Sequence, residues 1–308
     1  MIVRNLRDGE QDAILELWDA GFVATSRGYF AKYFTDPAWT LDDTVVCEVE
    51  GRLVSAVHVV RRRVRSQVGE LGLAGIANVA THPDFRGRGY NTACLTELLA
   101  RLDKDPSLDF CLLGTDIHHY YARHGFERWN FAGREGTPVG AVRNPDDGLL
   151  VRPATPADFD AIRRLYAHYN HLRPFSVLRP EAYWQDWMNL DFAQVLVATD
   201  AQAAPRGYLL HRIEGDVLLT EEIAAYGDER CVLEALLIEA VRLARHYGVT
   251  RLRLLVPLDD TLQDVVNALL VDATPFPIDW WMVRPLRNIT IPFGFREQRP
   301  FFWESDSF

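Results

Sequence analysis

The stretch that decides the fold runs from Gly75 to Leu102 and begins Gly75-Ile-Ala-Asn-Val-Ala-Thr-His-Pro-Asp-Phe-Arg-Gly-Arg-Gly-Tyr-Asn91. Its apolar first part predicts a buried strand, and its centre predicts a short loop rich in glycine and arginine. The segment after the loop predicts an amphipathic helix, because leucines recur at the i, i+3, i+4 and i+7 positions: Leu95, Leu98, Leu99 and Leu102.

Two glycines make this loop suited to phosphate. Gly87 and Gly89 let the backbone turn sharply with its amide groups facing outward. The helix that follows directs its positive dipole end at the same place. We therefore expect an anion-binding turn. The alternative is a plain strand-to-helix turn whose arginines are solvated.

The whole run, from the His-Pro-Asp-Phe lead-in to the helix start, resembles the pyrophosphate loop of the GNAT superfamily of acyl-CoA-dependent N-acyltransferases. That loop reads Gln/Arg-x-x-Gly-x-Gly/Ala; Arg86 fills its first position and Gly89 its fourth, whereas Asn91 departs from the sixth. The resemblance implies acetyl-CoA as cosubstrate, with its pantetheine arm paired to the strand and its pyrophosphate on the loop amides. The implied cofactor-binding residues are Val79, Ala80, Thr81, Arg86, Gly87, Arg88, Gly89, Tyr90, Asn91, Thr92 and Asp116.

Length and composition indicate a two-domain globular protein. The chain has 308 residues, of which 48% are hydrophobic and 25% charged. It contains no apolar run near the roughly 18 residues of a membrane span, and residues 1–10 lack a signal-peptide pattern. We expect a cytoplasmic protein that does not bind a membrane.

Charge and cysteine content bound the partners. A net charge of −10 argues against nucleic acid and mildly favours a cationic substrate. The four cysteines lie far apart in apolar segments, which predicts buried thiols rather than metal ligands or disulfides. Three histidines near Tyr121 lack a further ligand at metal-binding spacing, so we expect no metal there. The cysteines are Cys47, Cys94, Cys111 and Cys231, and the histidines are His118, His119 and His124.

Alternation of strand and helix patterns predicts an α/β (α+β) fold, with a mixed twisted sheet flanked by helices. The expected strands are 2–4, 44–50, 53–64, 71–81 and 110–116, with the second and third forming a hairpin around Gly51. The expected helices span 9–20, the segment after the phosphate loop, and a short turn closed by Gly125.

A second beginning appears at residue 151. Val3-Arg4 and the helix pattern 12–18 match Val151-Arg152 and 160–166 without a gap, at an offset of 148 residues. The repeat predicts two tandem GNAT-like domains, residues 1–147 and 148–286, followed by an aromatic C-terminal tail, 287–308. In the second copy the helix approach contains one glycine, Gly227, and two carboxylates, Asp228 and Glu229, which predicts that this copy no longer binds the cofactor.

An intact first copy with a degenerate second resembles the enhanced intracellular survival (Eis) type of tandem GNAT acetyltransferase, here without the sterol-carrier-like domain of that family. Mycothiol synthase is a rival match, which would imply a competent second copy. The Eis resemblance implies that Tyr121 is the general acid toward the leaving thiolate, which its ordinary pKa near 10 allows. The alternatives are that Tyr121 only packs a helix, or that Tyr120 has the role.

A general base is harder to identify. Residues 76–81 contain no acidic side chain. The Eis resemblance implies instead the terminal carboxylate, carried here by Phe308. Residues 293–308 include six aromatic residues, too many for a disordered tail, so we expect the tail to dock between the copies. The alternative is that these aromatic residues seal the second domain or a subunit interface, which leaves a homo-oligomer open.

The sequence therefore predicts an acetyl-CoA-dependent N-acetyltransferase that acts on a primary amine at a cleft beside the first domain. Aminoglycoside-like polyamines, lysine side chains and small metabolite amines all fit. The strongest alternative is a non-catalytic acyl-CoA-binding or sensor protein. It is favoured by the missing base, whereas the enzyme is favoured by Tyr121.

Overall fold

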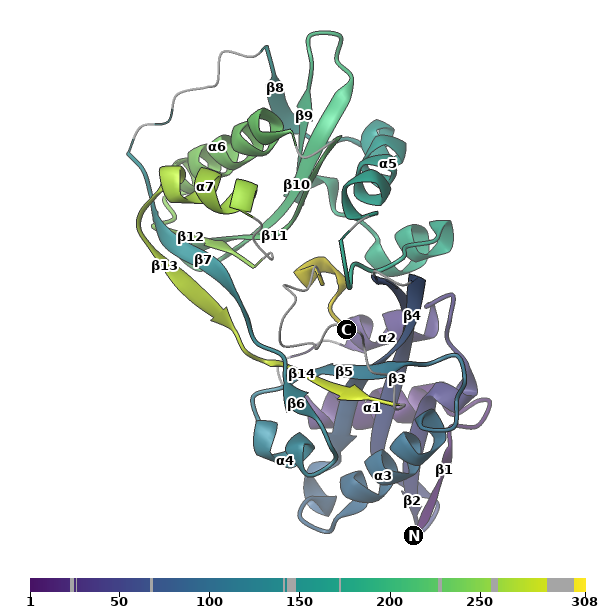
Figure 1. Ribbon diagram of the computed structural model, residues 1–308. Coiled ribbons are helices and arrows are strands. Elements are labelled where there is room, and N and C mark those ends of the chain that lie inside the picture. Colours follow the sequence, from purple (N-terminus) through teal and green to yellow (C-terminus); the bar gives the residue numbers. More distant parts are fainter. Residues whose placement is uncertain are drawn as a thin grey trace.

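The computed structural model describes residues 1–22, 25, 27–66, 69–140, 142, 148–171, 173–226, 229–255, 260–286 and 302–308. The chain forms two mixed seven-stranded sheets, each flanked by helices (Figure 1). The α/β fold of two similar units is therefore confirmed. No helix in the described ranges is long and apolar enough to cross a bilayer.

The first sheet contains the phosphate loop. Its strand order is β1 (Ile2–Asn5), β2 (Thr44–Val49), β3 (Arg52–Ser66), β4 (Gly69–Thr81), β5 (Phe110–Gly114), β14 (Trp281–Pro285) and β6 (Glu127–Arg128). Helices α1 (Gln11–Gly21) and α2 (Arg27–Ala31) pack on one face, where Ile14, Trp18 and Phe30 are buried. Helices α3 (Tyr90–Leu102) and α4 (His118–Ala122) cover the other face.

The second sheet repeats this plan. Its order is β8 (Leu150–Pro153), β9 (Val195–Thr199), β10 (Pro205–Glu214), β11 (Val217–Ala225), β12 (Arg251–Leu254), β7 (Phe131–Pro138) and β13 (Leu270–Ile278). Helix α5 (Phe159–Asn170) lies on one face, and α6 (Arg230–His246) and α7 (Asp260–Leu269) lie on the other (Figure 1). Short helical turns connect these elements: η1 (Lys32–Phe34), η2 (Leu41–Asp43), η3 (Pro83–Phe85), η4 (Pro156–Asp158), η5 (Tyr183–Met188), η6 (Phe192–Gln194) and η8 (Glu304–Asp306).

The two sheets exchange one strand each. Strand β7 of the first half lies between β12 and β13, and β14 of the second half lies between β5 and β6. Both exchanged strands occupy the sixth place from the end that begins with β1 or β8. The predicted limit near residue 147 therefore divides the chain into two halves, each of which contributes one strand to the sheet of the other. Residues 143–147 lie outside the described ranges.

The repeat is visible in one ion pair per copy. Arg4 of β1 donates to both carboxylate oxygens of Glu10, at 2.8 and 2.7 Å. Arg152 of β8 donates to both oxygens of Asp158, at 2.8 Å each. These residues are related by the same offset of 148. Each pair closes the turn between the first strand of its sheet and the first helix, so the repeated sequence builds a repeated structure.

Some sequence-based details differ. The first helix begins at Gln11 rather than residue 9, and β5 ends at Gly114 rather than residue 116. The four cysteines, all in the described part of the chain, carry free thiols; Cys231 is exposed, against the expectation that all are buried. It lies in the first turn of α6, whose buried stripe begins one residue later at Val232.

Candidate active site

The two central strands of the first sheet part where the motif begins to turn. Strands β4 and β5 are parallel and paired only from Leu73–Phe110 to Gly75–Leu112. Beyond Gly75, β4 continues to Thr81 without β5 beside it. The edge of β4 that faces away from β3 is therefore open over its last residues, and its amides and carbonyls can pair with an extended ligand.

A bulge bends β4 at this opening. The register with β3 shifts between Ala56, opposite Ala80, and His58, opposite Ala77. Asn78 in the bulge has φ of +48°, a left-handed conformation that asparagine tolerates better than most residues. Sequence reasoning missed Asn78, although an asparagine inside an otherwise apolar strand is a usable signal.

A cleft of about 530 Å³ lies at the end of β4. Nine of the eleven expected cofactor-binding residues line it; Arg88 and Asp116 do not. The lining consists of Gly21, Val79, Ala80, Thr81, Phe85, Arg86, Gly87, Gly89, Tyr90, Asn91, Thr92, Ile117, Tyr120 and Tyr121. One cavity thus brings together the open strand edge, the glycine loop, the start of α3 and the two tyrosines.

The loop backbone is held in a conformation that needs glycine. Gly87 and Gly89 have φ of +75° and +79°, and no atom lies within 4 Å of a Cβ built on either. Gly89 is the residue directly before α3, so the unpaired amides of the first helical turn face the cleft. The loop can therefore accept a phosphate without a side chain in the way.

Positive charge lies beside these amides. Arg86 donates to the carbonyls of Thr81 and Gly21, at 3.4 and 3.3 Å. Arg88 donates to the carbonyl of Asp84 and stacks over Phe85. Among the described residues neither arginine has a carboxylate partner, so the charge of this exposed loop is not neutralised locally. The cleft therefore favours an anion.

The two tyrosines of α4 have different surroundings. The Tyr120 hydroxyl donates to Asn91 Oδ1 at 2.7 Å and lies 3.3 Å from the Thr92 hydroxyl, so it is held by the loop. The Tyr121 side chain is 6% exposed, and its hydroxyl has no hydrogen-bond partner within the described ranges. Burial raises the pKa of Tyr121, and Tyr120 and Asp116 raise it further. Tyr121 therefore keeps its proton at neutral pH.

The histidines beside these tyrosines do not line the cleft. His118 Nε2 lies 2.8 Å from the carbonyl of Asp279, and Arg128 donates to its Nδ1. His118 thus joins α4 to the link between β13 and β14. In the part of the chain that the structure describes, no three His, Cys, Asp or Glu side chains converge as metal ligands.

The last residues of the chain pack between the two cores. Phe302 and Phe308 join the core under α1 and α2, whereas Trp303 joins the core of the second sheet. The Phe308 ring lies over Gly75 of β4, so closely that a Cβ there would come within 2.4 Å of it. Figure 1 shows this end of the chain between the two sheets. The other tail aromatics, Phe293, Phe295 and Phe301, lie outside the described residues.

A second, polar cleft lies where the tail meets both halves. Its volume is about 250 Å³, and it is lined by Lys32, Trp187, Met188, Asn189, Leu190, Asp191, Gln194, Val195, Leu210, His211, Glu221, Ser305 and Ser307. We call it the tail cleft. Burial lowers the pKa of Lys32 to about 8. His211 is 8% exposed, and its Nδ1 has no partner among the described residues. Sequence reasoning missed this cleft, because its residues come from five separate segments.

The described residues at the equivalent place in the second sheet differ from the glycine loop of the first. Strands β11 and β12 are also parallel and part after Thr220–Leu254. However, α6 is preceded by Glu229, whose carboxylate pairs with Arg206. Gly227 and Asp228 lie outside the described residues. A carboxylate beside a helix N-terminus makes that end of the helix less favourable for a second anion.

Comparison with known proteins agrees with this geometry. Residues 2–129 match the model of the acetyltransferase (GNAT) domain family. Residues 2–129 are therefore similar to GNAT acetyltransferase domains. Among curated proteins, none matches the sequence.

Solved structures share the fold over most of the chain. A probable N-acyltransferase from Enterococcus faecalis is 18% identical to this chain, with a TM-score of 0.72. The match covers 92% of this chain and 72% of the Enterococcus chain. A GCN5-related N-acetyltransferase from Anabaena variabilis is 15% identical, with coverages of 93% and 73% and a TM-score of 0.70. Eis1 from Mycobacterium abscessus is 17% identical, with coverages of 93% and 74% and a TM-score of 0.63. The fold is that of two GNAT-like units in tandem.

Proposed function

We propose that the protein transfers an acetyl group from acetyl-CoA to a primary amine, in the manner of Eis-type tandem acetyltransferases. The observation that carries the proposal is the single cleft that joins an open β4 edge to an unobstructed glycine loop at a helix N-terminus. This combination suits a ligand with an extended amide-bearing arm and a pyrophosphate.

Each part of the cleft has a separate task in holding the cosubstrate. The free edge of Val79, Ala80 and Thr81 would pair with the pantetheine arm. The amides from Gly87 to Thr92 would hold the pyrophosphate, with Arg86 adding positive charge. Arg88 and Asp116 remain predicted contributors, although neither lines the cleft.

Tyr121 is the proposed general acid. When the amine attacks the thioester carbonyl, the carbon–sulfur bond breaks and the sulfur leaves with its electron pair. A protonated group beside the sulfur lowers the barrier to this departure. Tyr121 suits the task because it lines the cleft, keeps its proton and has a hydroxyl not engaged by any described residue. Tyr120 suits it less, because Asn91 already accepts its hydrogen bond.

Phe308 is the proposed base. Its ring is seated on Gly75, four residues before Val79 on the same strand, or about 13 Å along it. The terminal carboxylate of Phe308 would accept the amine proton through a hydrogen bond. Adding one glycine after Phe308 would keep the ring and move the carboxylate, which separates the two roles.

The tail cleft is the proposed site for the amine. Ser307, the neighbour of Phe308, lines it together with the carboxylates of Asp191 and Glu221. These carboxylates and the unpartnered His211 nitrogen can accept hydrogen bonds from an ammonium or hydroxyl-bearing substrate. Polyamines, lysine side chains and small metabolite amines remain the candidate classes. The free thiols support a reducing, cytoplasmic location.

The second candidate is a non-catalytic acyl-CoA-binding protein. It is favoured by the lack of an acidic side chain on β4 from Ile76 to Thr81. A mycothiol-synthase-like enzyme would need a competent second copy, and Glu229 at the start of α6 weighs against that.

A thiol-release assay tests the proposed function. The native protein is given acetyl-CoA and a panel containing a polyamine, a lysine peptide and small metabolite amines, and the Tyr121→Phe variant is run beside it. We expect amine-dependent thiol release from the native protein only. Acetyl-CoA binding without release on any amine would support the binding protein instead.

A further inference from the structure

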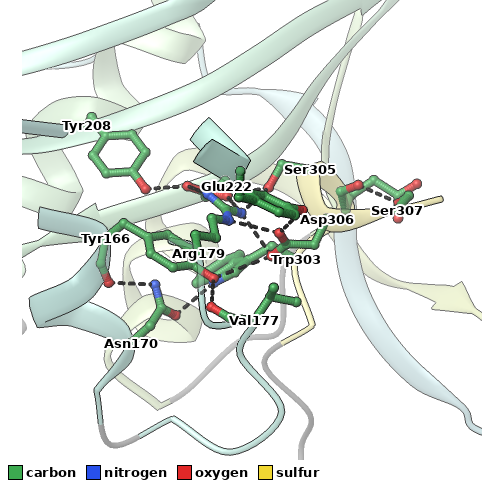
Figure 2. Close-up of polar contacts among 12 residues, drawn as sticks. Tyr166, Asn170, Val177, Arg179, Tyr208, Glu222, Trp303, Ser305, Asp306 and Ser307 are labelled. Carbon is green, nitrogen blue, oxygen red and sulfur yellow. Dashed lines mark hydrogen bonds and ion pairs between the residues drawn. The ribbon is translucent and has the colours of Figure 1, made fainter. Parts of the chain in front are cut away.

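The fully buried Arg179 holds the end of the chain. Its side chain is 0% exposed and lies between two carboxylates, that of Glu222 on β11 and that of Asp306 in η8 (Figure 2). Arg179 donates to both oxygens of Asp306, at 2.8 Å each, and to both oxygens of Glu222, at 3.1 and 2.5 Å. Its guanidinium also stacks 3.7 Å from the centre of the Tyr166 ring. All three nitrogens of the guanidinium therefore donate to a carboxylate.

Further donors fix the same carboxylates. Tyr183 donates to Asp306 Oδ1 at 2.7 Å, and Tyr208 and Ser305 both donate to Glu222. Burial raises the pKa of Tyr183 and of Tyr208, which keeps both hydroxyls protonated as donors. One residue of the tail, Ser305, thus contacts the sheet strand directly, and the next, Asp306, contacts it through Arg179.

A third anchor lies one turn earlier. The Trp303 indole donates to Asn170 Oδ1 at 2.7 Å, and Asn170 Nδ2 donates to the carbonyl of Tyr166 at 3.0 Å. Both side chains are buried. Residues 303, 305 and 306 are therefore all tied to the second copy by hydrogen bonds of fixed direction.

The cluster sits where β11 has lost its parallel neighbour. Glu222 lies two residues beyond Thr220, the last β11 residue paired with β12. The equivalent opening in the first sheet is the open edge of β4. In the second copy the tail contacts the parted strand, because Ser305 donates to Glu222.

Arg179, Glu222 and Asp306, which we call the clamp, fix the position of the residues at the end of the tail. Ser305 and Ser307 line the tail cleft, and Phe308 sits on Gly75 of the first sheet. Only Ser307 separates Asp306 from Phe308, so their Cα atoms are at most about 7 Å apart. Burying a cation with two carboxylates has a large desolvation cost, which apolar side chains would avoid. Directional ion pairs can, however, hold the tail in one register, which apolar contacts specify less strictly.

We propose that Arg179 is a positioning residue: the second copy uses it, through Asp306 and Glu222, to hold the tail so that Phe308 stays on β4 and Ser307 walls the tail cleft. The catalytic consequence rests on the proposed function. In this proposal the degenerate second copy positions residues of the first copy's active site.

Two readouts test this clamp. Hydrogen exchange measured by mass spectrometry reports residues 302–308 in the full chain, and steady-state kinetics reports kcat and both KM values. The variants are Arg179→Met, Arg179→Lys and the milder Tyr183→Phe, which loses one hydrogen bond to Asp306. Arg152→Met is the matched control, because it removes an Arg–Asp pair of the second copy that does not touch the tail.

We expect the hydrogen exchange of residues 302–308 to become at least about tenfold faster in Arg179→Met and severalfold faster in Tyr183→Phe. The exchange rate in Arg179→Lys should lie between these two. In the same order kcat falls and KM for the amine rises, while KM for acetyl-CoA stays constant. Arg152→Met leaves all of these unchanged.

Unchanged tail exchange in folded Tyr183→Phe and Arg179→Met would overturn the clamp. Faster exchange with native kcat and native KM for the amine would overturn its positioning role. If Arg179→Met does not fold, Tyr183→Phe and Arg179→Lys decide both points. A native protein without turnover refutes the proposed function separately, and tail exchange still decides whether the clamp exists.

Discussion

The two copies open their sheets in the same way and use the opening differently. In the first, β4 leaves β5 after Gly75 and faces a cleft with a bare glycine loop. In the second, β11 leaves β12 after Thr220, and a buried Arg179 beside it binds the protein's own tail. The comparison teaches that a repeated fold can keep its geometry while its chemistry differs: we propose that the first copy binds a ligand and that the second supplies part of the wall of that site.

The largest effect that separates the copies is expected at the glycine loop. Gly89→Glu puts a carboxylate where a pyrophosphate would lie, so acetyl-CoA affinity should fall about 100-fold or more. Arg230→Glu at the start of α6 should leave affinity unchanged. Calorimetric titration measures both.

Gly51→Glu is the matched control for Gly89→Glu. Gly51 also has a positive φ, +76°, and open space around a Cβ, but lies in the hairpin between β2 and β3. Both changes therefore carry a similar backbone cost of about 1–2 kcal/mol and the same added charge. Equal loss of affinity in the two variants would mean that strain, not the loop, explains the result.

A smaller effect is expected for the proposed acid. Tyr121→Phe should lower kcat about 10- to 100-fold and leave acetyl-CoA affinity unchanged, since only the proton donor is lost. Tyr120→Phe should instead weaken acetyl-CoA affinity a fewfold, because its hydroxyl holds Asn91. Steady-state kinetics with titration of each variant checks this. A reversed pattern would exchange the roles of the two tyrosines.

The contact between the tail and β4 can be broken without changing the tail. Gly75→Ala would drive a Cβ into the Phe308 ring, and overpacking of this kind costs about 1–3 kcal/mol. We expect a lower thermal midpoint and a kcat reduced about tenfold. Gly114→Ala on the neighbouring β5 is the control, because its Cβ would meet Trp281 at an ordinary 3.6 Å. Native activity in Gly75→Ala would argue against the proposal that the seated ring positions the terminal carboxylate.

The smallest effect concerns pH. Burial, together with the nearby carboxylate of Glu221, raises the pKa of Glu304 to about 7. The folded state therefore favours the protonated carboxyl, and its contribution to stability is present below the unfolded pKa of about 4.5 and lost as pH rises through 7. The slope is at most about 1.4 kcal/mol per pH unit. Glu304→Gln should flatten the dependence of the unfolding midpoint on pH, whereas Glu181→Gln should not.

Local patterns allowed much of the first site to be predicted. The period of the α3 leucines, the positive-φ glycines and the strand before them all act within about thirty residues, so the sequence shows them directly. The 148-residue repeat likewise predicts the second sheet, and each copy's Arg–carboxylate pair follows from it.

Long-range pairing could not be predicted. Nothing in the pattern of β7 or β14 says which sheet each strand joins, because a strand's residue pattern does not identify the strands with which it pairs. Arg179 in a polar connection looks like a solvated arginine until Glu222 and Asp306 are brought to it. The contact of Phe308 with Gly75 depends on the same tertiary arrangement, and a glycine in a strand only hints at a close approach.

The stoichiometry of acetyl-CoA binding tests the central claim most directly. Calorimetric titration of the native chain should give one acetyl-CoA per chain, and titration of Gly89→Glu should give none. Two sites per chain, or one site that survives in Gly89→Glu, would contradict the assignment of ligand binding to the first copy and of tail binding to the second.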